Sequence, residues 1–105
     1  MIPEEFVECC ARERDSLLEM YLGPPSQSSV AHDIASLALS DDQRQVMEKV
    51  IGGVLTDVFY TFLLGLDGAA SIGGQQVAYK LFDAGGNELT GELEELAWAR
   101  FQGAR

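Results

Sequence analysis

Three side chains close together in the sequence have the residue types of a hydrolase triad. Ser29, His32 and Asp33 offer a nucleophile, a base and a carboxylate within one short segment. That chemistry also needs an oxyanion site and supporting groups that hold the base in place. Near neighbours on a solvated helix face supply neither, so we expect no triad. His32 is the only histidine and cannot form a zinc site without several converging ligands.

Two further patterns resemble ligand-binding motifs but lack essential residues. Gly68 and Gly73 have the spacing that opens a phosphate-binding Walker loop, yet Gly74 and Gln75 stand where lysine and serine or threonine are required. The acidic turn 83–88 has calcium-binding residue types without the register of an EF-hand. The sequence therefore predicts no catalytic residues, no metal and no cofactor, and we expect a protein that is not an enzyme.

The composition predicts one globular domain, residues 1–105, with an acidic surface. Hydrophobic residues make up 47% of the chain and charged residues 23%, which is usual for a folded unit of this size. Seven basic against seventeen acidic side chains give a formal net charge of −10, which repels nucleic acids and anionic membranes. The same charge favours solubility and speeds the encounter with a basic partner.

The cysteines and the N-terminus predict a cytoplasmic protein. Cys9 and Cys10 are adjacent, so they cannot form the spaced bridges of small secreted domains, and we expect reduced thiols. The first ten residues have neither the basic region nor the apolar core of a secretion signal. Helical spacing places Cys10 in the core and Cys9 at its margin, where Cys9 is the more reactive thiol.

Periodicity predicts a mostly helical α+β domain. Three N-terminal helices, a β-hairpin and a C-terminal helix follow one another, with the long third helix as the axis. Ser40 and Gln43 match a capping box at the start of the long helix, and Gly68 is suited to end it. Residues 77–82 alternate with the period of a strand, and residues 88–90 return as the second strand of the hairpin.

The long helix is apolar around most of its circumference. Its apolar residues come in adjacent pairs about every four positions from Val46 onward, and a narrow strip holds Lys49, Gly53, Thr56, Asp57 and Tyr60. A membrane span would place Asp57 near the bilayer centre at a cost of about 2.5 to 3.5 kcal/mol, which disfavours it. Our main prediction is the buried axis of a small bundle. The alternative is an interface on one side of the helix, for example with a second copy.

The last helix, within residues 91–102, carries an aromatic residue that does not share its apolar face. Trp98 projects with Glu94 and near Glu95, and an exposed tryptophan among carboxylates is typical of a binding hot spot for a basic, partly apolar partner. The competing interpretation packs Trp98 against the hairpin or the first helix. The residues to which we assign partner binding are Glu92, Glu94, Glu95, Trp98, Asp57 and Tyr60.

These features favour a small acidic protein-binding module. The profile as a whole is similar to that of bacterial immunity or antitoxin proteins that block a basic toxin, and this resemblance implies that the protein occludes a basic protein partner. The alternative is a self-associating helical protein in which the long helix forms a symmetric homodimer without a separate client. An enzyme would need a pocket that combines His32, Cys9 or Asp57 with groups from elsewhere in the fold.

Overall fold

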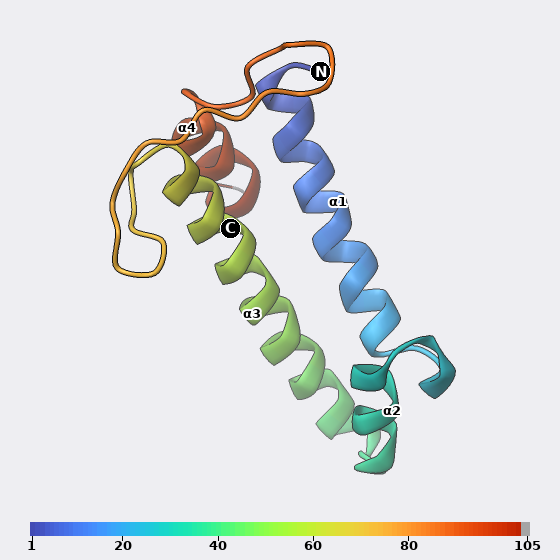
Figure 1. Ribbon diagram of the computed structural model, residues 1–105. Helices are drawn as coiled ribbons and strands as arrows, with labels where there is room; N and C mark the ends of the chain where they lie inside the picture. Colours follow the sequence, from blue (N-terminus) through green and yellow to red (C-terminus); the bar gives the residue numbers. More distant parts are fainter. Residues whose placement is uncertain (104–105) are drawn as a thin grey trace. The chain divides into compact units, whose positions relative to one another are not determined.

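The computed structural model describes residues 1–103, and all regular structure in this part of the chain is helical (Figure 1). The elements, in order, are α1 (Pro3–Tyr21), a 3₁₀ turn (Pro25–Gln27), α2 (Ser29–Ser36), α3 (Asp41–Leu66), α4 (Leu93–Ala97) and a π-helical turn (Trp98–Gln102). The π-helical turn follows α4 directly. The helical character predicted from the sequence is confirmed.

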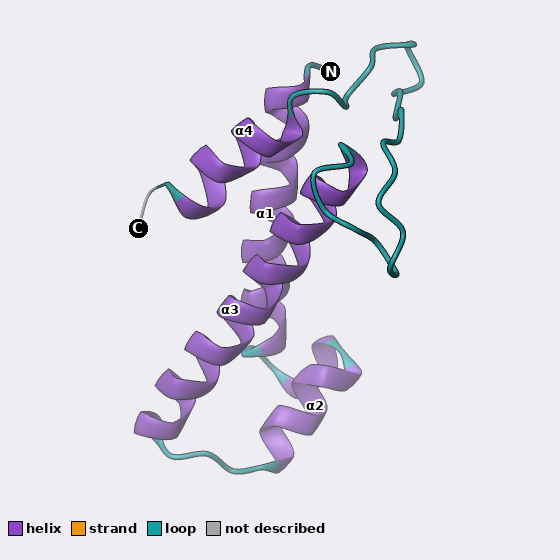
Figure 2. Cartoon of the chain, turned by 90° about the vertical axis from the view of Figure 1, so that its left-hand side faces the viewer, coloured by secondary structure: helices purple, strands orange, loops and turns teal. Residues whose placement is uncertain are grey.

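The predicted β-hairpin is absent, so the α+β fold class is wrong for the described residues. Residues 1–103 contain no strand, and the chain between α3 and α4 is drawn as loop throughout (Figure 2). Residues 77–82 and 88–90 meet in one isolated bridge, between Phe82 and Glu88. The described part of the chain is therefore an all-α structure with one long connecting loop.

The hydrogen-bond partners of the predicted first strand explain why no ladder forms. The backbone N–H of Tyr79 donates to the carbonyl oxygen of Leu66, at the end of α3, over 2.8 Å. The backbone N–H of Leu81 donates to the side-chain Oγ1 of Thr90 over 3.2 Å. A hairpin needs such donors for the opposite strand. Here the two N–H groups donate to a carbonyl at the end of α3 and to a side chain, and not to the backbone of an opposite strand. The alternating residue pattern is nevertheless that of a strand.

The chain divides into two compact units, which we describe separately. The first unit comprises Met1–Arg12 and the chain from Asp57 onward, and the second comprises Glu13–Thr56. Helices α1 and α3 each contribute a segment to both units. The single domain expected from chain length stays a prediction.

The core of the first unit joins the start of α1, the end of α3 and the C-terminal helix. Its buried residues are Val7, Ala11, Leu63, Leu93, Ala97 and Phe101. Phe6 and Cys10 are partly buried and pack against this cluster, so Cys10 lies at the edge of the core and not, as the spacing predicted, within it. The apolar face of the last helix is also confirmed, because Leu93, Ala97 and Phe101 are its buried residues.

The second unit is organised by helix caps. The Oγ atom of Ser28 accepts a hydrogen bond from Ala31 N–H (3.0 Å) at the start of α2. Ser40 and Gln43 form the predicted capping box of α3, with Ser40 N–H bonded to Gln43 Oε1 (2.9 Å) and Gln43 N–H bonded to Ser40 Oγ (3.2 Å). These bonds satisfy donors that a helix start otherwise leaves free.

The start of α4 is fixed by a residue outside the helix. Sequence reasoning places Thr90 or Gly91 at the cap, but the carboxylate of Asp67, just beyond α3, takes that role. It accepts hydrogen bonds from the backbone N–H groups of Gly91 (2.7 Å), Leu93 (2.6 Å) and Glu94 (3.3 Å). A negative charge there also interacts favourably with the helix dipole. Asp67 thus ties the end of α3 to the start of α4.

A second carboxylate, Asp83, organises the loop between these helices. It accepts hydrogen bonds from the α-amino group of Met1 (2.9 Å), from Gly85 N–H (3.0 Å) and from Asn87 N–H (2.9 Å). The bond from the α-amino group and then those from Asn87 hold the pKa of the Asp83 carboxyl well below its ordinary value of 3.8. The ionised form of Asp83 therefore stabilises the folded loop.

Gly65 is the helical glycine whose replacement we expect to disturb packing. A Cβ atom at this position would overlap the side chain of Ile72, with Cδ1 only 2.7 Å away. At Gly52, in the same helix, the nearest atom is Leu18 Cδ2 at 3.7 Å, an ordinary contact.

In urea denaturation, Gly65→Ala should lower the free energy of unfolding by about 1–3 kcal/mol. The matched control, Gly52→Ala, should raise it by about 1 kcal/mol. Equal effects of the two variants would contradict this packing.

We expect Asp83 to make the stability of the protein fall in acid. Because its pKa is lower in the folded than in the unfolded chain, its contribution is fully present above the ordinary value of 3.8 and is lost as the pH falls below it. Asp83→Asn should therefore be less stable than the wild type at about pH 6, and the difference should shrink at about pH 2. Urea denaturation at both pH values measures this.

The control for the acid experiment is Asp33→Asn, which removes an exposed carboxylate of α2. This variant should change stability little at either pH. A deficit of Asp83→Asn that is as large at pH 2 as at pH 6 would show that the ionised carboxylate is not the stabilising form.

Candidate protein-binding site

Four of the residues predicted to bind a partner line one open hollow in the first unit. They are Tyr60 of α3, Glu94 and Glu95 of α4, and Trp98 at the start of the π-helical turn. The hollow has a volume of about 290 Å³. We call it the Trp98 hollow. Residues that are more than 30 positions apart in the sequence thus share one surface feature.

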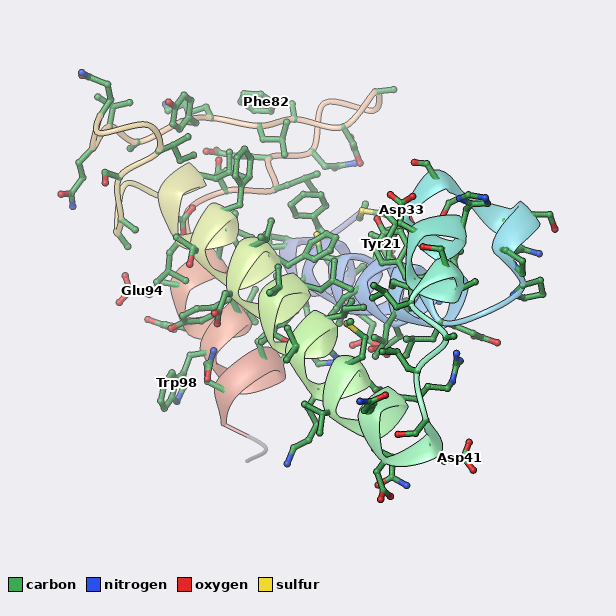
Figure 3. All side chains as sticks on the ribbon, turned by 90° about the horizontal axis from the view of Figure 1, so that it is seen from below. Tyr21, Asp33, Asp41, Phe82, Glu94 and Trp98 are labelled. Carbon is green, nitrogen blue, oxygen red and sulfur yellow. The ribbon has the colours of Figure 1, made fainter. Side chains whose placement is uncertain are left out.

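The packing of the last helix keeps Trp98 at the surface. Leu93, Ala97 and Phe101 occupy the side of this helix that faces the core. Glu94 and Trp98 are four residues apart, and both project to the same side of the C-terminal helix (Figure 3). Trp98 is 57% exposed, so the interpretation in which it folds into the protein is wrong.

The other two predicted binding residues, Asp57 and Glu92, lie outside the lining of the hollow. Both are exposed. Asp57 precedes Tyr60 by about one turn of α3, and Glu92 directly precedes α4. The structure thus brings together four of the six predicted residues, and the remaining two add negative charge to the same unit.

The chemistry of the Trp98 hollow suits a cation that carries an apolar stem. Within residues 1–103, its lining combines two aromatic rings with two carboxylates and includes no basic side chain. Arg100, the basic residue nearest in sequence, donates from Nε to Glu8 Oε2 over 2.7 Å. Lysine and arginine place an aliphatic stem beside apolar surface and a charge beside aromatic faces or carboxylates. The hollow therefore matches a basic side chain better than an anion.

Helix α3 exposes a row of apolar side chains that sequence reasoning placed in the core. The row consists of Val46, Val50, Val54, Val58 and Phe62, whose side chains are each between 53% and 61% exposed. The buried residues of the helix are only Leu63 and Gly65. The prediction that the long helix is the buried axis of a bundle is therefore wrong.

The paired apolar pattern explains this outcome. Of each adjacent pair in α3, the second member is partly or fully buried, whereas the first member is exposed. The buried or partly buried set is Met47, Ile51, Leu55, Phe59 and Leu63. The described chain covers one apolar side of α3 and leaves the other open. Periodicity shows that both sides of α3 are apolar. It does not show how much apolar surface the rest of the chain has to cover them.

Helix α3 is also the one helix of residues 1–103 that is long and apolar enough to cross a membrane. Its most apolar 18-residue window has a mean hydropathy of 1.5, and 11% of that window is buried. These properties alone are a weak sign, since the core helix of a soluble protein can share them. They leave the expected cytoplasmic location a prediction.

The residue types associated with catalysis or metal binding do not converge in the described chain. Within residues 1–103, no group of three or more histidine, cysteine, aspartate or glutamate side chains could hold a metal ion. His32 is exposed on α2, and its Nδ1 lies 3.6 Å from Oδ1 of Asp33. Cys9 and Cys10 are free thiols, and burial raises the pKa of Cys10. The expected lack of enzymatic activity stays a prediction.

Sequence reasoning missed a second apolar hollow in the first unit. It has a volume of about 540 Å³, and its apolar lining includes Ile2, Val7 and Leu96. Glu4 and Glu5, in the first turn of α1, also line it. Periodicity predicted both α1 and the last helix, but it did not show that the first turn of α1 and the last helix line one hollow. This hollow lacks the exposed tryptophan that distinguishes the Trp98 hollow.

Comparisons with models of protein families, with curated proteins and with solved structures gave no match to this chain. The geometry and charge of its own residues therefore provide the basis for assigning a function.

Trp98 is the only tryptophan of the chain, so its fluorescence reports on the hollow alone. Relative to a free tryptophan derivative, caesium ions should quench it more strongly than iodide, because Glu94 and Glu95 attract cations. Glu94→Gln combined with Glu95→Gln should make the quenching efficiencies of caesium and iodide more similar. Glu4→Gln with Glu5→Gln makes the same charge change on α1 and should have a smaller effect. Stronger quenching by iodide in the wild type would contradict an acidic hollow.

Proposed function

We propose that this protein is a binding module for a basic, partly apolar segment of another protein, which it occludes through the Trp98 hollow. The observation that carries the proposal is the exposed Trp98 beside Tyr60, Glu94 and Glu95 in one hollow. Tryptophan is enriched among the residues that dominate binding energy, and such residues contribute about 2 kcal/mol or more when they become fully desolvated.

Charge supports the same type of partner. The chain has a net charge of −10, and two carboxylates line the hollow itself. Exposed charges of this kind act mainly on the rate of encounter and on partner choice, whereas a buried aromatic anchor sustains the complex. A lysine or arginine over the Trp98 ring would add about 0.5 to 2 kcal/mol. A basic side chain followed by aliphatic residues would use both features.

We place this activity in the cytoplasm. The free thiols of Cys9 and Cys10 support this location, because reducing compartments keep thiols in that form. Occlusion requires no reacting group in the hollow: the protein would act by covering the basic surface of its partner.

A selection from random dodecapeptides displayed on phage tests the proposal. Peptides retained by the immobilised protein should be enriched in arginine or lysine next to aliphatic residues. Synthetic versions should bind the wild type and lose at least about tenfold in affinity for Trp98→Ala, which corresponds to about 1.4 kcal/mol. Glu94→Gln with Glu95→Gln should weaken binding and reduce its dependence on salt.

The matched control for Trp98→Ala is Phe82→Ala, which removes another exposed aromatic side chain of the same unit. Its affinity for the selected peptides should be unchanged. Enrichment of acidic or purely apolar peptides would overturn the proposal, as would equal binding to the wild type and to a Trp98→Ala variant whose circular dichroism shows a native fold.

A further inference from the structure

The exposed side of α3 presents two parallel rows of side chains. The first is the apolar row described above, from Val46 to Phe62. Directly beside it, also four residues apart and also exposed, run Lys49, Gly53, Asp57 and Thr61. We call the two rows together the α3 face. Rows four residues apart form the ridges that commonly interlock when two helices pack.

The apolar row reads almost the same in both directions. Val54 is its centre, with Val50 and Val58 one step away and Val46 and Phe62 at the ends. If a second α3 lies antiparallel about a twofold axis near Val54, the central members of the row, Val50, Val54 and Val58, meet apolar members of the other copy. An isologous contact of this type uses the same surface on both chains and closes after two copies.

The charges of the α3 face complement one another in the same arrangement. Lys49 and Asp57 are eight residues apart, or about 12 Å along one helix, which is too far for a direct ion pair within that helix. A reversed second copy brings Lys49 near the other chain's Asp57, and the twofold axis repeats this contact. A parallel pair in register would place equal charges opposite each other, which is unfavourable.

Gly53 lies near the centre of the face and leaves the backbone uncovered. A Cβ atom there would meet no atom of residues 1–103 within 4 Å. Between two copies, this position allows the helices to approach closely around the twofold axis. Lipid is a poorer cover for the same face, because Asp57 would cost about 2.5 to 3.5 kcal/mol at the centre of a bilayer.

We infer that the α3 face is the interface of an antiparallel homodimer centred near Val54. This interface is independent of the Trp98 hollow, because none of its residues lines that hollow. The partner of the exposed apolar row is thus a second copy of the chain.

Charge reversal tests the pairing of Lys49 with Asp57. Sedimentation equilibrium should show a dimer of the wild type that resists high salt, since apolar contacts form most of the interface. Lys49→Asp and Asp57→Lys should each weaken dimerisation at least about tenfold, because each places like charges together twice. The double variant, Lys49→Asp with Asp57→Lys, should regain most of the affinity.

Cysteine cross-linking tests the register. In a Cys9→Ser, Cys10→Ala background, Val54→Cys should form a disulfide-linked dimer with diamide as the oxidant, because the two Val54 positions face each other. Val46→Cys alone should not, since the two copies of this residue would lie about 24 Å apart, beyond the roughly 7 Å limit for a disulfide. Val50→Cys mixed with Val58→Cys should cross-link.

Each other occupant of the face gives a distinct result. A monomer at all concentrations would overturn the inference, and so would flotation of monomers with vesicles of neutral phosphatidylcholine. Cross-linking of Val46→Cys to itself would indicate a parallel pair and would also overturn it. Trp98→Ala should dimerise like the wild type, so failure of the Trp98 hollow to bind basic peptides leaves this result unaffected.

Discussion

The carboxylate of Asp67 holds the C-terminal helix against the end of α3, and the geometry of the first unit depends on that bond set. Three backbone N–H groups at the start of α4 donate to this one side chain. A helix as short as α4 has little stability of its own in water, so it needs such a cap and a packed face. With the start of α4 fixed, Leu93 enters the core and Glu94 and Glu95 point away from it. The Trp98 hollow is the outer side of that arrangement.

Signals that act within one helix were sufficient to predict the helices of this chain. The Ser40 and Gln43 capping box is a local pattern, and its two hydrogen bonds form as expected. The apolar spacing of the last helix likewise identified its buried side. From that spacing alone, Trp98 and Glu94 were placed on the opposite side, which is where the structure has them. The part of the site that lies on the C-terminal helix was therefore predictable from the spacing in that helix.

Contacts between distant segments were not predictable in the same way. The alternation in residues 77–82 is a sound strand signal, but the donor of Tyr79 is taken by Leu66 and that of Leu81 by Thr90. Similarly, the cap of α4 lies more than 20 residues upstream of the helix it serves. The exposure of α3 depends on the total apolar surface available to cover it, and periodicity does not measure that quantity. Each error therefore concerns which distant segment supplies a hydrogen-bond acceptor, a helix cap or a covering surface. The local residue patterns themselves were identified correctly.

The composition of the first unit has a consequence for the order of events during synthesis. Its core pairs Val7 and Ala11 with Leu93, Ala97 and Phe101, which follow more than 80 positions later in the sequence. Glu8 and Arg100, which form an ion pair, are separated by 92 positions. The apolar side of α1 therefore stays uncovered until more than 80 further residues have been translated. Contacts of such large sequence separation form slowly, and the acidic surface keeps the waiting nascent chain soluble.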